Sequence, residues 1–103
     1  MSVEKLLEDF GPDAHVHAVV LKEVSESNQA EWCSAAAEFA TQTRAEPGCI
    51  RFQYLRVKGS SPPRFMLCEE WESLDALKAH FKTDHFARLV PVSCLHELLI
   101  VFL

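Results

Sequence analysis

Hydrophobic residues recur along the chain with two different periods, which predicts a mixture of strands and helices. In four stretches apolar and polar residues alternate or β-branched residues dominate, as is typical of strands. In two other stretches apolar residues recur every three or four positions, which favours amphipathic helices. The predicted strands cover residues 15–24, 49–58, 64–71 and 95–103, and the predicted helices cover residues 28–45 and 74–82.

Capping residues mark where the predicted helices begin. Asn28 and Glu31 have the spacing of a capping box at the start of the first helix. Ser73 can cap the second helix, and Thr83 or Asp84 can cap a further short helical turn behind it. The chain therefore carries a local start signal for each predicted helix.

The period of each element also predicts which side chains share a face. The apolar stripe of the first helix contains Trp32, Ala36, Phe39 and Thr43. One face of the second strand carries Ile50, Phe52 and Tyr54, and one face of the third strand carries Phe65, Leu67, Glu69 and Trp71.

The order of elements is the βαββαβ pattern of a ferredoxin-like α+β fold, with an antiparallel sheet and both helices on one face. Turn formers at residues 59–63 predict a hairpin between the second and third strands. The other face of the sheet is also apolar, because the third strand carries Met66 and Cys68 there. A second copy of the chain is the simplest cover, so a homodimer is expected. The domain is expected over residues 15–103, with residues 1–14 as an appendage that forms a short helix.

Composition and charge argue against several classes of protein. Hydrophobic residues make up 49% and charged residues 24%, which is typical of a folded globular domain. The net charge is -5 and the ten basic residues are scattered singly, which argues against nucleic acid as a partner. The longest apolar run, residues 98–103, is far shorter than the roughly 20 residues that span a bilayer, so no membrane association is expected. Acidic residues at the N-terminus favour a cytoplasmic location.

Motifs for metals and nucleotide cofactors are missing from the sequence. The four cysteines, Cys33, Cys49, Cys68 and Cys94, form no CxxC pair and have no histidine at zinc-ligand spacing, so free thiols are expected. The sequence also lacks a glycine-rich phosphate loop and a dinucleotide fingerprint. A nicotinamide or flavin site is therefore not indicated.

Three short segments carry a combination of motifs. They are Glu46-Pro47-Gly48-Cys49, Phe65-Met66-Leu67-Cys68-Glu69-Glu70-Trp71-Glu72-Ser73, and Ala79-His80 followed by Asp84-His85-Phe86. In this order and context they resemble the antibiotic biosynthesis monooxygenase family, in particular its quinol monooxygenase and autoinducer-processing branches. The resemblance covers nearly residues 15–103 and implies a ferredoxin-like domain that forms a dimeric α/β barrel. It also implies oxidation of an electron-rich aromatic without a bound cofactor. One branch of the family binds haem, but no residue here is singled out as its axial ligand.

Three residues in these segments are candidate catalytic residues. His80 lies at the edge of an apolar stripe, and an imidazole can exchange protons near neutral pH, as a general base requires. Trp71 could donate its indole N–H to a substrate oxygen, or it could only close the core. Glu69 could act as a base or bind the substrate, or it could form a structural ion pair. Its candidate partners are Arg51, Arg56 and Arg64.

Four further residues are candidates for substrate binding: His85, His17, Tyr54 and Phe81. His85 could line the mouth of the pocket or merely end a helix. His17 shares a face of the first strand with His15 and could reach the same cavity, or it could be an ordinary residue of the sheet. Tyr54 could orient the substrate, and Phe81 adjoins the candidate base. Because His85 follows His80 by five positions rather than four, a shared metal site is disfavoured, and no metal or cofactor is expected.

The leading hypothesis is a cofactor-independent monooxygenase that acts on a small phenol, hydroquinone or polycyclic enol. His80 would remove a proton, and the resulting anion would react directly with molecular oxygen. The pocket is expected between the second helix and the third strand, near Trp71 and His80. Two alternatives stay open: a ligand-binding or stress-related dimer without turnover, and an isomerase of a small keto or phosphorylated sugar.

Overall fold

In the computed structural model the chain is described over residues 11–89 and 96–102, and its side chains over residues 11–88. The elements in chain order are β1 (Val16–Glu23), the 3₁₀ turn η1 (Glu26–Asn28), α2 (Gln29–Arg44), β2 (Cys49–Arg56), β3 (Arg64–Trp71), α3 (Leu74–His80), α4 (Asp84–Leu89) and β4 (His96–Phe102). The helix predicted within residues 1–14 and the thiol of Cys94 lie outside the described residues.

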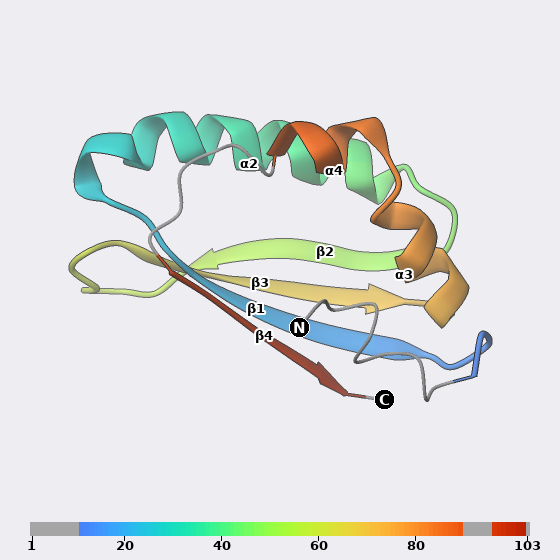
Figure 1. Ribbon diagram of the computed structural model, residues 1–103. Coiled ribbons are helices and arrows are strands. Elements are labelled where there is room, and N and C mark those ends of the chain that lie inside the picture. Colours follow the sequence, from blue (N-terminus) through green and yellow to red (C-terminus); the bar gives the residue numbers. More distant parts are fainter. Residues whose placement is uncertain (1–10, 90–95, 103) are drawn as a thin grey trace.

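The strands form one sheet in the order β2-β3-β1-β4, and each neighbouring pair is antiparallel. Figure 1 shows α2 and α4 lying over one face of this sheet, with α3 at the end of β3. The predicted ferredoxin-like order and the placement of both helical segments on one face are therefore confirmed. Within the described residues no helix is long and apolar enough to cross a membrane.

The capping box predicted for the first helix is wrong. Asn28 makes no side-chain cap hydrogen bond, because it is the last residue of the 3₁₀ turn that precedes α2 and has helical backbone angles itself. The cap of the second helix is confirmed, since the Ser73 side chain accepts a hydrogen bond from the backbone N–H of Ala76. Thr83 caps α4 in the same way, accepting from the N–H of Phe86.

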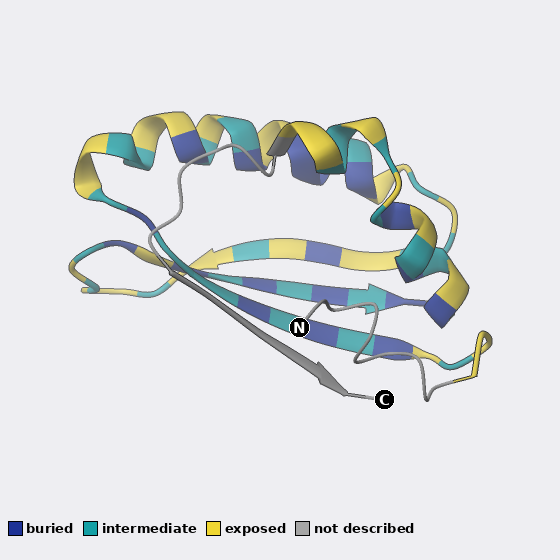
Figure 2. Ribbon diagram, in the orientation of Figure 1, coloured by how far each residue is buried: buried dark blue, intermediate teal, exposed yellow. Residues whose placement is uncertain are grey.

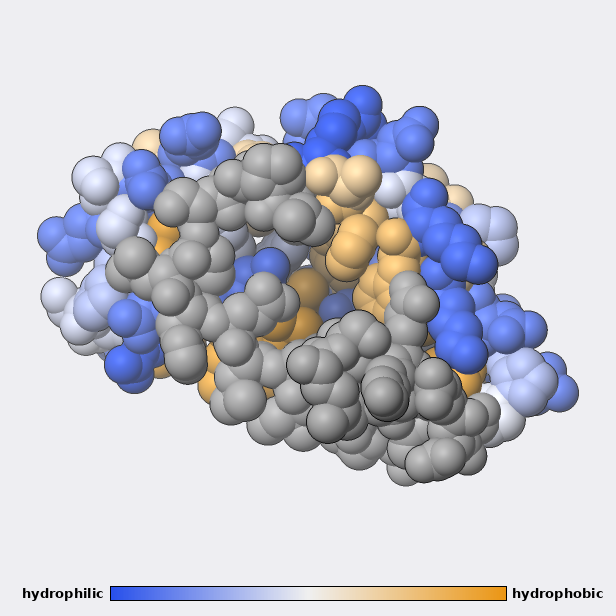
Figure 3. Space-filling model, viewed as in Figure 1, coloured by the Kyte–Doolittle hydropathy of each residue, from blue (hydrophilic) through white to orange (hydrophobic). Residues whose placement is uncertain are grey.

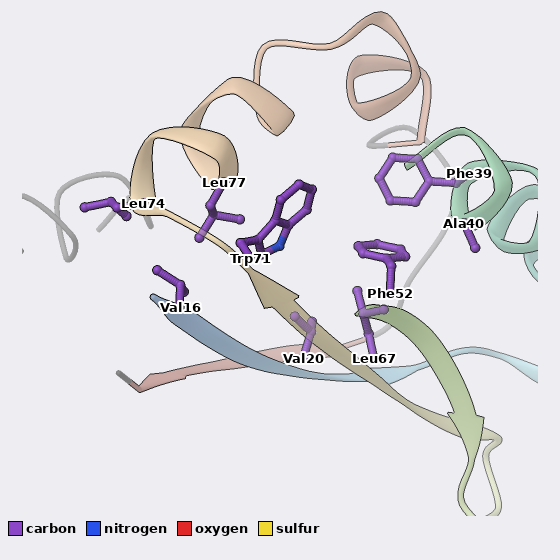
Figure 4. Close-up of a cluster of buried hydrophobic side chains, with 9 residues drawn as sticks. All are labelled: Val16, Val20, Phe39, Ala40, Phe52, Leu67, Trp71, Leu74 and Leu77. Atoms are coloured by element: carbon purple, nitrogen blue, oxygen red, sulfur yellow. The ribbon is translucent and has the colours of Figure 1, made fainter. Parts of the chain in front are cut away.

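The core lies between the sheet and the helices, as the buried residues in Figure 2 show. Its main cluster, drawn in Figure 4, consists of Val16, Val20, Phe39, Ala40, Phe52, Leu67, Trp71, Leu74 and Leu77. A second cluster consists of Val24, Trp32, Ala36 and Phe65. On β3 the residues predicted to share a face, including Glu69 and Trp71, are all buried, so the predicted alternation is confirmed.

Ile50 does not face the core with Phe52, as the period of the second strand predicted. A bulge between Cys49 and Arg51 inserts Ile50 as an extra residue, because Cys49 lies opposite Trp71 and Arg51 already lies opposite the next residue of β3. Ile50 is consequently 49% exposed, and Cys49 takes the place beside the core.

The face of the sheet away from the helices is partly apolar. Leu55 is 43% exposed and lies opposite Met66 of β3, and Cys68 is only half-buried on the same side. Exposed apolar side chains on this face are what a second subunit would cover, but the homodimer stays a prediction.

Gly48, in the loop that leads into β2, is the position where a larger residue should do most harm to the local structure. Its φ of 84° lies in the left-handed region, and an added Cβ would lie 2.6 Å from the Cβ of Ala76 on α3. Gly48→Ala is expected to lower the free energy of unfolding by about 2–4 kcal/mol, of which about 1–2 kcal/mol is backbone strain. Urea denaturation measures this loss.

Gly59 provides a matched control for this substitution. Its φ is 74°, but no atom lies within 4 Å of an added Cβ. Gly59→Ala should therefore show the backbone strain without the contact with α3. Equal losses in the two variants would contradict close packing of the Gly48 loop against α3.

Candidate active site

Three polar side chains from separate parts of the chain meet at one carboxylate oxygen. Glu46 lies in the loop after α2, His80 is the last residue of α3, and His85 is in the first turn of α4. Oε2 of Glu46 lies 2.7 Å from Nδ1 of His80 and 2.7 Å from Nε2 of His85. These three residues are called the buried triad below.

The turn between α3 and α4 brings the two histidines together. The Thr83 hydroxyl donates a hydrogen bond to the carbonyl oxygen of His80 at 2.8 Å and caps α4. Because α3 ends at His80 and a new helix begins at Asp84, the two histidines do not lie on one continuous helix. Both imidazoles nevertheless reach Glu46, because the turn between the two helices sets their positions.

Aromatic rings surround the imidazole of His80, which is only 2% exposed. The ring centroids that lie within 6 Å of it belong to Phe39, Phe52, Trp71, Phe81 and Phe86, with Trp71 nearest at 5.0 Å. Burial lowers the pKa of His80 below its ordinary value of 6.5, and the neighbouring His85 lowers it further. The hydrogen bond to Glu46 and the negative charge of that carboxylate act in the opposite direction. The neutral imidazole is therefore favoured at neutral pH.

Glu69 and Trp71 form a second buried pair beside this histidine. The indole N–H of Trp71 donates a hydrogen bond to Oε1 of Glu69 at 2.9 Å. Trp71 is 0% exposed and Glu69 is 8% exposed. Two of the arginines predicted as partners of Glu69 make other contacts: Arg64 pairs with Glu23 at 3.2 Å, and the guanidinium of Arg56 lies over the ring of Phe65. The Trp71 N–H expected to hold a substrate oxygen is thus already engaged.

The four candidates for substrate binding divide between the two faces of the sheet. His85 and Phe81 lie beside His80, as predicted. Tyr54 is on the helix-covered face, with its ring against those of Trp32 and Phe52. His17 lies on the opposite face, because it is paired in register with Glu70.

The interpretation that His17 reaches the cavity of His80 is therefore wrong. In β1 the residues on either side of it, Val16 and Ala18, are the ones that face the core. The sheet separates His17 from the helices, and a strand places successive side chains on opposite faces.

Over the part of the chain that the structure describes, two cavities adjoin the helices. One of about 460 Å³ lies over the outer side of the Glu46 loop and α3 and includes Glu46, Gly48, Ser73 and Thr83 in its lining. The other, of about 350 Å³, lies between α2 and β2 and reaches Tyr54 and Phe65. In the view of Figure 3 apolar side chains, in orange, lie between the polar outer surface of the helical layer and the sheet.

Glu46 is the functional candidate that the sequence reasoning missed. It stands first in the segment Glu46-Pro47-Gly48-Cys49, which resembles the family, but no period or spacing in the sequence assigns a role to its carboxylate. Glu46 also affects the thiol of Cys49, three residues further along the chain. Burial makes the largest contribution, and with the negative charges of Glu46 and Glu69 it raises the pKa of Cys49 to about 11. Cys49 is therefore a protonated thiol and not a nucleophile at neutral pH.

Among the described residues, two groups of side chains have ligand atoms that a metal ion could use. One is the buried triad, and the other is His15, His17 and Glu70 on the far face of the sheet. In the buried triad aromatic rings occupy the space around His80, which leaves little room for the water molecules that complete a coordination shell. The triad is better suited to moving a proton, with a carboxylate that holds an imidazole.

The described residues define a ferredoxin-like α+β domain with a buried histidine–carboxylate site between its helices and its sheet. The family model for antibiotic biosynthesis monooxygenases matches residues 15–92. The chain belongs to the antibiotic biosynthesis monooxygenase family, as the three motif segments indicated. No curated protein matches the chain.

Several solved structures are similar over most of the chain. A conserved protein from Bacteroides thetaiotaomicron, whose description suggests an oxidoreductase, has 29% identity and a TM-score of 0.80, over 87% of this chain and 97% of its own. A Caulobacter crescentus protein with a provisional name as an antibiotic biosynthesis monooxygenase has 25% identity and a TM-score of 0.80, over 92% and 93%. A similarly named protein from Nitrosomonas europaea, at 21% identity and a TM-score of 0.80 over 90% and 91%, shows the fold alone.

Proposed function

We propose that this protein is a monooxygenase that oxidises a small, electron-rich phenol or hydroquinone without a bound cofactor, with His80 as the general base. The observation that carries the proposal is the 2.7 Å hydrogen bond between Glu46 and a histidine that is buried among aromatic rings. Family membership supports monooxygenase chemistry in general. The substrate class and the role of each residue are the proposal.

The hydrogen bond to Glu46 fixes which nitrogen of His80 can accept a proton. An ionised carboxylate only accepts, so Nδ1 carries the hydrogen and Nε2 keeps its lone pair. A buried carboxylate plays this part for the histidine of hydrolase triads, where it sets the tautomer and stabilises the imidazolium that forms. Here His85 donates to the same oxygen and keeps the carboxylate in place.

Proton removal would prepare the substrate for oxygen. A phenolate is a far better electron donor than its phenol, so it can pass an electron to triplet oxygen and then combine with the superoxide formed. Loss of water from the resulting hydroperoxide gives a quinone, so a phenol and O₂ yield a quinone and H₂O. One oxygen atom enters the ring and the other leaves as water, with no external reductant. The aromatic rings around His80 would exclude bulk water from this intermediate.

Oxygen consumption by the full chain tests the proposal. The protein, treated with a chelator, is offered a panel of phenols and hydroquinones, and the product is analysed after turnover under ¹⁸O₂. One labelled oxygen atom per product molecule is the expected result. A product without labelled oxygen would indicate simple dehydrogenation where oxygen is consumed, or an isomerase where it is not. Binding without turnover of any substrate would indicate a ligand-binding protein, and each of these results contradicts the proposal.

Glu46→Gln should separate the positioning role of this carboxylate from a merely structural one. The variant keeps the size of the side chain but loses the charge that raises the pKa of His80. We expect turnover to fall about 10²-fold, within the range attributed to general base catalysis. The acidic limb of the kcat/KM profile should also move to lower pH, because a weaker base titrates at lower pH.

Glu72→Gln is the matched control for this change. Glu72 is an exposed carboxylate at the edge of the cavity that Glu46 also lines. It should leave both turnover and the pH profile unchanged. A Glu46→Gln variant that lost activity without any movement of its acidic limb would show that Glu46 only supports the fold.

A further inference from the structure

A second histidine–carboxylate cluster lies on the face of the sheet away from the buried triad. Nε2 of His15 is 2.8 Å from Oε2 of Glu70, and Nε2 of His17 is 4.0 Å from the same oxygen. The two imidazole rings are 5.0 Å apart. The proposed oxidation makes no use of these three residues, which we call the surface cluster.

The strand geometry explains why the surface cluster forms. His15 directly precedes β1 and is two positions before His17, so the two side chains extend on the same side of the chain. Glu70 of β3 is the register partner of His17, and opposite residues of antiparallel strands share a face. The carboxylate therefore reaches both imidazoles from the neighbouring strand.

From this geometry we propose that the surface cluster is a binding site for a divalent transition-metal ion, such as Zn²⁺. Two imidazole nitrogens and one carboxylate oxygen are a donor set that Zn²⁺ accepts, with a fourth position left for water. All three ligand atoms lie within 4.8 Å of one another. Tetrahedral Zn²⁺ with bonds of about 2.0–2.1 Å requires ligand atoms roughly 3.3 Å apart. This separation lies between the 2.8 Å from Glu70 to His15 and the 4.0 Å from Glu70 to His17.

Exposure favours this cluster over the buried triad as the metal site. In the single chain the side chains of His15 and His17 are 49% and 39% exposed, so small rotations can adjust the ligand distances. The homodimer predicted above would cover part of this face, so water completes the coordination shell where the second copy leaves the cluster open. The Glu70 side chain is 21% exposed and forms ion pairs with these histidines alone among the described residues. Arg51 of β2 is the register partner of Glu70 on the other side of β3.

Calorimetric titration of the chelator-treated full chain with Zn²⁺ tests the site. One ion per chain is expected, and each of His15→Gln, His17→Gln and Glu70→Gln should raise Kd at least about tenfold, because the loss of even an outer-shell partner weakens metal binding by that factor. All three positions are exposed or half-buried, so the variants should stay folded, and their circular dichroism spectra check this.

Two control variants make the assignment specific. Glu72→Gln removes an exposed carboxylate close to Glu70 in sequence, and Glu46→Gln disables the buried triad. Both should leave the Kd for Zn²⁺ within about twofold of that of the unmodified chain, a change of at most about 0.4 kcal/mol. Loss of binding in Glu46→Gln would move the site to the buried triad and overturn the proposal.

The stoichiometry and the surface variants supply the remaining outcomes. One ion per two chains would mean that two copies share an ion, which also contradicts a site built by one chain. Unchanged Kd in all three surface variants would overturn the proposal outright. None of these results depends on whether the protein turns over a phenol, so the metal site and the proposed oxidation can fail separately.

Discussion

Replacing His80 with glutamine is expected to lower kcat for oxygen-dependent turnover by about 10²–10⁴-fold, the usual contribution of a general base. The reason is that His80 is the buried imidazole whose Nδ1 is held by Glu46, so its other nitrogen is the one set to accept a proton. Glutamine fills similar space and can still donate to the carboxylate. Oxygen uptake with the best phenol of the panel, together with single-turnover rates, measures the loss.

His85→Gln is the matched control for the base. His85 donates to the same oxygen of Glu46 and is also part of the aromatic surround, but it is less buried than His80. This variant should lose far less activity, because the glutamine amide can still donate to Glu46 and the base itself is unchanged. Equal losses in the two variants, or full activity in His80→Gln, would remove His80 from the mechanism.

His80→Gln should also change how the free energy of unfolding depends on pH. Because burial lowers the folded-state pKa of His80 below its unfolded value of 6.5, the unfolded chain binds this proton more tightly. The contribution of the neutral imidazole is fully present above pH 6.5 and is lost as the pH falls from 6.5 toward the folded-state pKa. The slope is at most about 1.4 kcal/mol per pH unit for one group. Urea denaturation between pH 5 and 8 should show a shallower dependence in His80→Gln.

The elements of the fold were predictable because their signals are local. β3 begins and ends where the alternation predicted, and Ser73 caps α3 as a serine before a helical stripe should. Two predictions about Ile50 and Asn28 failed, because the spacing of hydrophobic residues carries no information about bulges or 3₁₀ turns. The bulge at Ile50 adds one residue to β2 only, and the 3₁₀ turn before α2 takes Asn28 into helical angles.

The site was less predictable, because it depends on which residues meet across the fold. His80 follows from its position at the edge of a helical stripe, but Glu46 lies 34 positions away in a loop, and no period relates the two. His17 shows the opposite limit, since its strand was correctly predicted but the period of a strand does not say which of its two faces meets the core. Once Val16 and Ala18 are assigned to the core, alternation alone places His17 on the far face.

Replacing Trp71 is expected to have the largest effect on stability. Trp71 is fully buried where the sheet meets α3, and its ring contacts that of His80. Trp71→Ala should lower the free energy of unfolding by about 3–5 kcal/mol, as is usual when a large aromatic residue leaves a cavity in a core. Urea denaturation measures this loss, and a loss below 1 kcal/mol would contradict the buried position.

Trp71→Phe divides this loss between packing and hydrogen bonding. The smaller ring still fills much of the core position, but the N–H that reaches Oε1 of Glu69 is gone. A buried acceptor that loses its donor costs about 1–3 kcal/mol. If that bond accounts for the loss, Trp71→Phe should cost much less in a chain that already carries Glu69→Met, where no carboxylate needs a donor. Equal costs in both backgrounds would mean that the hydrogen bond to Glu69 contributes little to stability and that Trp71 acts through packing.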